Sequence, residues 1–474
     1  MALCRARAQP TSAPSGLLGP ALRSEEGDPR LPGASGRDRS VQPLDTRCPE
    51  AALAPERAAC FRCAPMGVWL DLVGRTDPAS ALARLTTALE ARGLAATPVQ
   101  AEDGPALSVP LHPAAEPLVI SATRTGVRAA IRTGTAGPGL HAHASELLGA
   151  LGDELGIAWD PAGDPTGYFA TRELARVEDA LLAQLGELAR EVLVLAGRGA
   201  ADLALFLPDD VRFEHDGLLA TPLGPRDRAW VERVARDPRQ GIDVLAWWAP
   251  GEDAAYHRGR ALAELWTEFR WRPPLDDRER AQHARVLASL ERAYALDPEL
   301  ELPWRAWSEL LQLTGEDSLR ATRTHLRAER APLAPPIGYR RRPVRVELSG
   351  GWSLRVPGTL ATEWRERGTW VGWDAVRSVW FTSVTREGDG DDTETTLAGL
   401  PELRGEGDTL AMERGPIRGA VRFGAHEEGG RTLSAMWAQA AAGRHAALGT
   451  FVLSGEDDRQ LAMEIWGSLD RAKD

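Results

Sequence analysis

The spacing of apolar residues changes near residue 343, and this change constrains the fold more than any other feature of the sequence. Beyond this point, Val344, Val346 and Leu348 alternate with charged residues, and the segments 352–356 and 417–423 repeat the alternation. A period of two is typical of β-strands that bury one face. The last part of the chain is therefore predicted to form a sheet.

A helix is expected after the last of these strands. Leu461, Ile465 and Leu469 follow one another at intervals of four residues, which places them on one side of a helix. Asp457 or Asp458 precedes them and can cap the first turn. Residues 344–474 are therefore predicted to form a C-terminal antiparallel sheet with one packed helix.

Before residue 331 the apolar residues have helical spacing. Leu262, Leu265, Trp266 and Phe269 lie at positions i, i+3, i+4 and i+7, which is the pattern of an amphipathic helix. Short apolar runs that favour strands occur nearer the beginning of this region. We therefore expect residues 201–330 to contain short strands followed by a helical middle.

Two further segments have compositions that disfavour a packed core. Residues 1–65 are rich in Pro, Ala, Arg, Ser and Gly and have no sustained apolar period, so a disordered tail is expected there. Residues 331–343, APLAPPIGYRRRP, are rich in proline and arginine and are predicted to be a linker.

Residues 66–200 combine strand and helix patterns. Leu70 and Leu72 belong to an alternating run, whereas Leu85 and Leu89 share one face of a helix. The order of the patterns predicts an N-terminal α/β domain with the elements β-α-β-β-β-α-α. Because 474 residues exceed the roughly 250–300 that one core holds, we expect a multi-domain α+β protein.

The composition excludes several kinds of chemistry. The chain has one lysine, Lys473, and no asparagine, so a Walker A phosphate loop is absent. All four cysteines precede residue 64, so no thiol nucleophile is expected in the folded part. The pair Cys60 and Cys63 lacks two further ligands at zinc-binding spacing. We expect neither a cofactor nor a bound metal.

Charge and hydropathy bear on partners and location. The formal net charge of −12 argues against binding to nucleic acid, because phosphate contacts need a basic face. No run of about 18 apolar residues is present, and the N-terminus lacks the apolar core of a signal peptide. A cytoplasmic protein without a membrane segment is therefore expected.

Two stretches resemble known families. The strand that ends in Pro-Gly (350–360), the aromatic hairpin (368–383) and the closing strand and helix (449–469) together resemble the PsbP-like α/β sandwich. This resemblance, over residues 344–474, implies a module that binds protein partners and carries over no functional residue. Residues 290–315 resemble a single tetratricopeptide-like helical hairpin, but a repeat array needs about three copies.

Tryptophan is concentrated in residues 364–383, which contain four such residues. Side chains alternate between the faces of a hairpin, so these rings cannot form one continuous stripe. We expect at least two to be core residues. The alternative is an aromatic binding site for another protein, formed by Trp370, Trp373 and Trp380 beside Arg377.

Two other groups carry potential chemistry. Glu214, His215 and Asp216 are adjacent, and a carboxylate paired with a histidine can act as a general acid or base in a hydrolase. His141 and His143 are the only closely spaced histidines, but the nearest carboxylate, Glu146, is expected to lie on the helix that follows, so no metal site is assigned.

The sequence therefore favours a non-catalytic protein-binding or accessory protein, with a hydrolase as the alternative. An immunity-like role, in which the protein masks a toxin or effector, agrees with the acidic charge. The sequence leaves the oligomeric state open.

Overall fold

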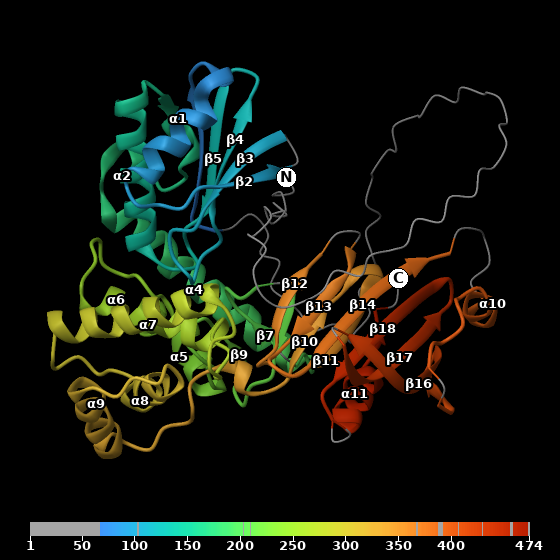
Figure 1. Cartoon of the computed structure of the whole chain (residues 1–474). Coiled ribbons are helices and arrows are strands. Elements are labelled where there is room, and N and C mark those ends of the chain that lie inside the picture. Colours follow the sequence, from blue (N-terminus) through green and yellow to red (C-terminus); the bar gives the residue numbers. More distant parts are fainter. Residues whose placement is uncertain are drawn as a thin grey trace, which may run out of the picture.

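The computed structural model describes residues 67–472, except residues 102–103, 202, 209, 366–367, 387–391, 406, 429 and 456–457. The tail expected over residues 1–65 lies outside the described residues. Helices and antiparallel sheets are both present, so the expected α+β fold class is confirmed. In Figure 1 an N-terminal part lies above a helical middle, and a C-terminal part with two sheets extends to one side.

The N-terminal part is a six-stranded sheet with helices against one face. Its elements are β1 (Trp69–Arg75), α1 (Pro78–Glu90), β2 (Thr97–Ala101), β3 (Gly104–Val109), β4 (Leu118–Thr123), β5 (Gly126–Arg132), α2 (Pro138–Leu155) and β6 (Ala158–Asp160). The strand order is β2-β3-β4-β5-β1-β6, and all neighbours are antiparallel. Leu70 and Leu72 of β1 pack with Leu85 and Leu89 of α1 in one core, as their spacing indicates.

The sequence did not predict β2. This strand contains Pro98, which cannot donate a backbone hydrogen bond, and it lies at the edge of the sheet. An edge strand tolerates proline because one side of its backbone has no neighbour to bond. The prediction of β-α-β-β-β-α-α therefore lacked one strand of the meander, as well as the short β6 (Ala158–Asp160).

The helical middle begins with α3 (Tyr168–Thr171) and α4 (Leu174–Gly197). It continues through β7 (Leu203–Ala204), β8 (Val211–Phe213), β9 (Leu219–Ala220), α5 (Arg228–Arg236), α6 (Ala254–Thr267), α7 (Asp277–Leu296), α8 (Trp304–Leu313) and α9 (Leu319–Arg330). Helices α5, α6, α7 and α9 each begin where a short polar side chain accepts a hydrogen bond from an N–H of the first turn. Asp276, for example, accepts a 2.8 Å hydrogen bond from the N–H of Glu279. In the described part of the chain, no helix has the length and apolar character needed to cross a bilayer.

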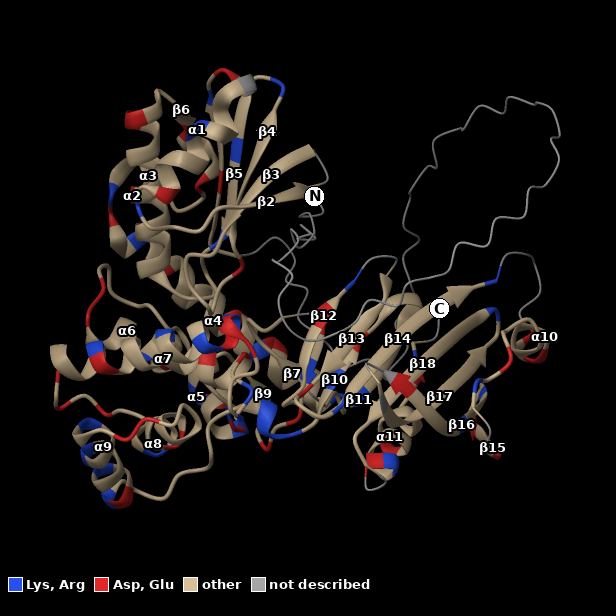
Figure 2. Ribbon diagram, viewed as in Figure 1, with Lys and Arg blue, Asp and Glu red and all other residues tan. Residues whose placement is uncertain are grey.

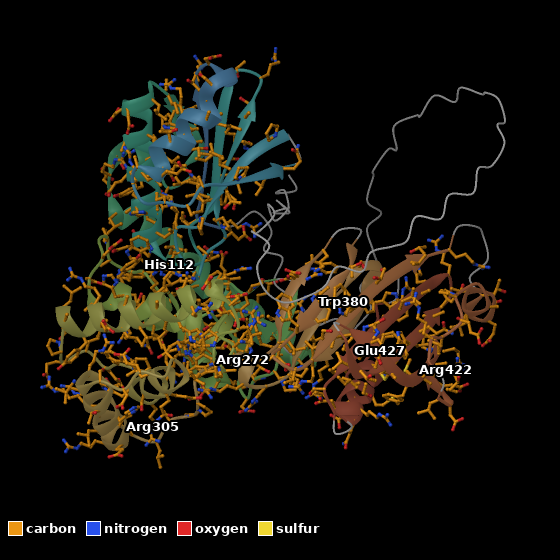
Figure 3. All side chains as sticks on the ribbon, in the orientation of Figure 1. His112, Arg272, Arg305, Trp380, Arg422 and Glu427 are labelled. Atoms are coloured by element: carbon orange, nitrogen blue, oxygen red, sulfur yellow. The ribbon has the colours of Figure 1, made fainter. Side chains whose placement is uncertain are left out.

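Trp247 joins the helical middle to the N-terminal part. It is 2% exposed and belongs to the same core as the N-terminal sheet. Its N–H donates to the carbonyl of Ala136, and its carbonyl accepts from the N–H of Gly139. A Cβ on Gly139 would lie 2.2 Å from the indole ring, so only glycine fits there. His112 also lies where these two parts meet, as Figure 3 shows.

The C-terminal part consists of two antiparallel sheets and a helix. Its elements are β10 (Val344–Glu347), β11 (Trp352–Val356), β12 (Ala361–Trp364), β13 (Trp370–Trp373), β14 (Ser378–Thr385), α10 (Thr393–Ala398), β15 (Thr409–Arg414), β16 (Ile417–Glu428), β17 (Arg431–Ala442), β18 (His445–Leu453), α11 (Asp458–Gly467) and β19 (Asp470–Arg471). The larger sheet has the order β12-β13-β14-β18-β17-β16-β15, and α11 packs on one face of it, with Phe451 6.2 Å from Trp466.

The segment 331–343, expected to be a linker, is partly an element of the core. Tyr339 and Arg340 are buried, and Tyr339 stacks on Phe213 with a centroid separation of 5.0 Å. The Tyr339 hydroxyl also bonds the backbone of Thr221. The composition indicated a solvated segment, but Tyr339 buries a large ring, and the buried Arg340 has its Nε bonded to the carbonyl of Thr267 at 2.7 Å.

The smaller sheet also crosses the boundary expected at residue 344. Its order is β19-β11-β10-β8, so β8 (Val211–Phe213) pairs with a strand that follows it by more than 130 residues. Arginine contacts reinforce this junction. Arg272 makes a two-point contact with Glu279 at 2.6 and 2.8 Å and donates to the carbonyl of Thr359. The middle and C-terminal parts therefore share one core.

Candidate functional site

The larger C-terminal sheet has one face that α11 leaves open. Val379 and Phe451 point toward α11, since they line a small void together with Ile465 of that helix. Side chains alternate along a strand, so Trp380 points the opposite way. We call this opposite side the outer face. Its row of paired residues runs from Val371 through Trp380 and Thr450 to Trp437.

Trp373 and Trp380 are the two rings of the hairpin on the outer face. Trp373 pairs with Ser378, and both tryptophans are partly exposed. The guanidinium of Arg365 lies 4.7 Å from the centre of the Trp380 ring. The Trp380 Nε1 donates to the Ser378 hydroxyl at 3.2 Å. A cation over one ring face and a fixed N–H hold the indole in one orientation against the sheet.

The other two tryptophans face the core. Trp370 lies opposite Phe381 in the sheet and Trp364 lies opposite Trp370, so the three share the face that packs against α11. Trp370 is 1% exposed and cannot contact a partner. The hypothesis that Trp370 binds a partner is therefore wrong, and its large ring serves the core instead.

Arg377 holds the turn between β13 and β14. Its Nη2 donates to Asp374 at 2.7 Å, and its Nη1 lies 3.6 Å from Asp458 at the start of α11. The N–H of Arg377 also bonds the Asp374 carboxylate. With two carboxylates beside it, this guanidinium ties the hairpin to the helix and supports the site without forming its surface.

The rest of the outer face is partly covered. The Thr393 hydroxyl of α10 accepts from the N–H of Gly443, and Arg422 donates to the carbonyl of Leu403 at 2.8 Å. These contacts hold α10 at the turn between β17 and β18, and hold the segment after α10 against β16. Val384, which is 49% exposed, continues the open area along β14. Val371, in the same row, is only 2% exposed, so the open part of the outer face is limited to Trp373, Trp380 and Val384.

Glu214, His215 and Asp216 do not form an acid–base centre. Glu214 pairs with Arg355 at 2.5 Å, whereas Asp216 forms a two-point contact with Arg342. The Arg342 hydrogen bond lowers the pKa of Asp216, which is the wrong direction for a general acid. Each carboxylate is thus bound by a separate arginine, and neither shares a hollow with the other.

A buried acid–histidine pair exists elsewhere, at the start of α2. His141 is fully buried; one ring nitrogen bonds Thr133 at 2.8 Å and the other lies 3.4 Å from Asp164. Burial acts to raise the pKa of Asp164, but hydrogen bonds from His141, from the N–H of Phe169 and from Thr166 lower it well below its usual range. No substrate can reach this pair, so it fixes α2 against the turn before α3.

His143, the second histidine of the expected pair, points away from His141. Its ring lies 5.1 Å from Trp247 at the junction with the helical middle. The two rings are separated because they lie on α2, where residues two apart do not share a face. Within the described ranges, no three His, Cys, Asp or Glu side chains are grouped to hold a metal ion.

Sequence reasoning missed two of these features. Arg365 carries no pattern of its own, and only its position one residue beyond β12 brings it over Trp380. The pair of His141 and Asp164 joins segments whose spacing resembles no known motif. Asp164 also accepts a hydrogen bond from the N–H of Phe169 at 2.7 Å, which closes the turn before α3.

Comparisons with known proteins add little. No family model matches the chain, and a search of curated proteins finds no match. A crystal structure of a protein from Bacteroides thetaiotaomicron is similar with 12% sequence identity and a TM-score of 0.22; the match covers 26% of this chain and 46% of that chain. A likeness of this size supports no statement about fold or function.

Proposed function

We propose that this protein is a non-catalytic, cytoplasmic accessory protein that binds another protein through the outer face of its larger C-terminal sheet. One observation carries the proposal: Trp373 and Trp380 lie partly exposed on an open sheet face, and Arg365 holds the second ring in place. Tryptophan and arginine dominate the binding energy of protein interfaces, especially where the ring is already ordered.

Two further observations agree with this role. The resemblance of residues 344–474 to the PsbP-like sandwich implies a module that binds protein partners. The carboxylates of Glu214 and Asp216 are each paired with an arginine, which favours the binding role over the hydrolase alternative. An immunity-like protein that masks a toxin is a specific form of this proposal.

Capture from the native host tests the proposal. We expect tagged full-length protein to retain a specific partner and the double variant Trp373→Ser, Trp380→Ser to lose it. The matched control is Val73→Ser, which removes a 44% exposed apolar side chain from the N-terminal sheet and should leave binding unchanged. Thermal melts must show that both variants are folded. Retention of the same partner by the double variant would refute the proposal, and so would the absence of any retained protein.

A further inference from the structure

Strand β15 (Thr409–Arg414) forms an exposed edge of the larger C-terminal sheet. Within the described residues it pairs only with β16, and Figure 2 shows it at the side of the molecule away from the helical middle. Leu410 is 47% exposed, and only Met412 of the strand is partly buried. The opposite edge, β12, has four residues and no fully exposed one. An open strand edge of this kind is a template for pairing with another strand.

The hairpin shows which backbone groups point outward. Arg414 pairs with Ile417 across a two-residue turn, so these two residues exchange the closing hydrogen bonds. Bonding alternates along the strand, so the backbone N–H and C=O groups of Leu410 and Met412 also point toward β16. The N–H and C=O groups of Thr409, Ala411 and Glu413 therefore point away from the sheet, where a second strand can bond them.

The side chains of β15 complement those of a second copy of the same strand that runs antiparallel to it. In an antiparallel pair of two β15 strands, residues with outward backbone groups must lie opposite one another, which excludes half of the registers. The register centred on Ala411 places Leu410 opposite Met412 and Asp408 opposite Arg414. It therefore pairs apolar with apolar and negative with positive side chains, both of which stabilise cross-strand neighbours.

Neighbouring registers lack this complementarity. A register centred on Leu410 places Asp408 opposite Met412, and one centred on Met412 places Leu410 opposite Arg414. Each sets a charged group against an apolar side chain. The backbone geometry allows all three of these registers, and the side chains favour the one centred on Ala411.

We propose that two copies of this protein associate through β15, as antiparallel strands centred on Ala411, so that their two larger sheets become continuous. A hollow of about 420 Å³ lies beside the edge and is lined by Asp408, Leu410, Phe423 and Arg459. In the pair, Met412 of the second copy lies next to Leu410 on the same face, where it extends the apolar wall of this hollow. This association does not involve the outer-face tryptophans.

Sedimentation velocity over a range of concentrations tests the proposal with the full chain. We expect a monomer–dimer equilibrium for the wild type and a monomer for Ala411→Pro. Proline removes an N–H that points outward, so it blocks the second strand and leaves the bonds between β15 and β16 in place. An unchanged melting temperature would show that the variant is folded.

A charge exchange tests the register itself. Asp408→Arg and Arg414→Asp should each abolish dimerisation, because like charges then face each other, and a mixture of the two variants should restore it. Arg414 also donates to the carbonyls of Gly467 and Leu469, so its variant needs a melt to confirm folding. A wild type that stays monomeric at every concentration overturns the proposal. A dimer that survives Ala411→Pro, or a mixture that stays monomeric, overturns it as well.

Discussion

The N-terminal sheet packs α1 and α2 against one face, and the larger C-terminal sheet packs α11 against one face, so each sheet has a second face that these helices do not cover. On that second face the N-terminal sheet carries Asp71, whose carboxylate forms a two-point contact with Arg128 at 2.6 and 2.7 Å. At the corresponding place the C-terminal sheet carries Trp373 and Trp380. The second face of the N-terminal sheet thus carries an ion pair, whereas that of the C-terminal sheet carries two partly exposed aromatic rings.

This difference shows where a binding site is to be sought. A salt bridge within a sheet satisfies its own charges and gives water a polar surface, so it needs no partner. Contact between the indole rings and water is unfavourable, so a partner that covers the rings gains free energy of binding. The residue types on the open face, and not the presence of a sheet packed on a helix, therefore indicate where a partner would bind.

The two sides of the aromatic hairpin are expected to differ most in stability. Trp370→Ala should lower the free energy of unfolding by about 3–5 kcal/mol, because it leaves a cavity under α11. Trp380→Ala should cost less, since its ring is partly exposed and no helix in the described part of the chain packs on it. Urea denaturation followed by tryptophan fluorescence measures both. Similar costs for the two variants would contradict the assignment of faces.

The attachment of the N-terminal sheet to the helical middle contains a buried histidine, so its contribution to stability depends on pH. His112 anchors the N-terminal sheet beside Trp247, and its burial, together with Arg260, lowers its pKa from 6.5 to about 3. Between about pH 6.5 and 3, His112 is therefore protonated in the unfolded chain but stays neutral in the folded chain. The resulting stability is complete above pH 6.5 and decreases by at most about 1.4 kcal/mol per unit as the pH falls toward 3.

His112→Asn isolates this contribution. Asparagine keeps an acceptor for the N–H of Ala114, which bonds the His112 Nδ1 at 3.1 Å, and it does not titrate. We expect the urea midpoint of this variant to fall less steeply between pH 6.5 and 4 than that of the wild type. Parallel pH profiles would show that His112 is not the group responsible.

The charge pair on the N-terminal sheet should contribute modestly. A double-mutant cycle with Asp71→Asn and Arg128→Gln is expected to give a coupling energy of about 0.5–1 kcal/mol, because both side chains keep more than a quarter of their exposure. Added salt should reduce the coupling. A coupling that does not change with salt would mean that the pair is more shielded from solvent than its exposure indicates.

The smallest effect is expected at Arg365. Arg365→Gln should lower stability by about 0.5 kcal/mol, the lower end for an exposed cation–π contact. Its effect on partner binding should be larger than on stability, because the Trp380 ring loses its fixed orientation. Binding of the captured partner, measured by surface plasmon resonance, tests this order. Equal binding by variant and wild type would leave Arg365 without a positioning role.

Much of the architecture could be predicted from local patterns. The alternation at Val344, Val346 and Leu348 predicted β10, and these residues are buried. Helical spacing at Leu262 and Leu265 predicted α6. Local patterns could not predict that β8 pairs with β10, or that Tyr339 fills a core, because these contacts join segments that are distant in the sequence.

The candidate site was only partly predictable for the same reason. The sequence indicated an aromatic hairpin and showed that its rings must divide between two faces. It did not indicate which of them α11 covers, and it placed Trp370 among the binding residues although that ring is buried. The arginine contacts that occupy Glu214 and Asp216 come from β11 and from the segment before β10, far along the chain.

The sequence by itself determined which side chains share a face and which chemistries are absent from the folded part, since periodicity and composition are properties of the chain alone. Tertiary structure decided which face is inside. In β14, both sides carry large apolar residues, Val379 and Phe381 on one and Trp380 and Val384 on the other, so the alternation does not identify the inner side. The packing of α11 over Val379 and Phe451 does. That choice buried Trp370 and left Trp373 and Trp380 at the surface.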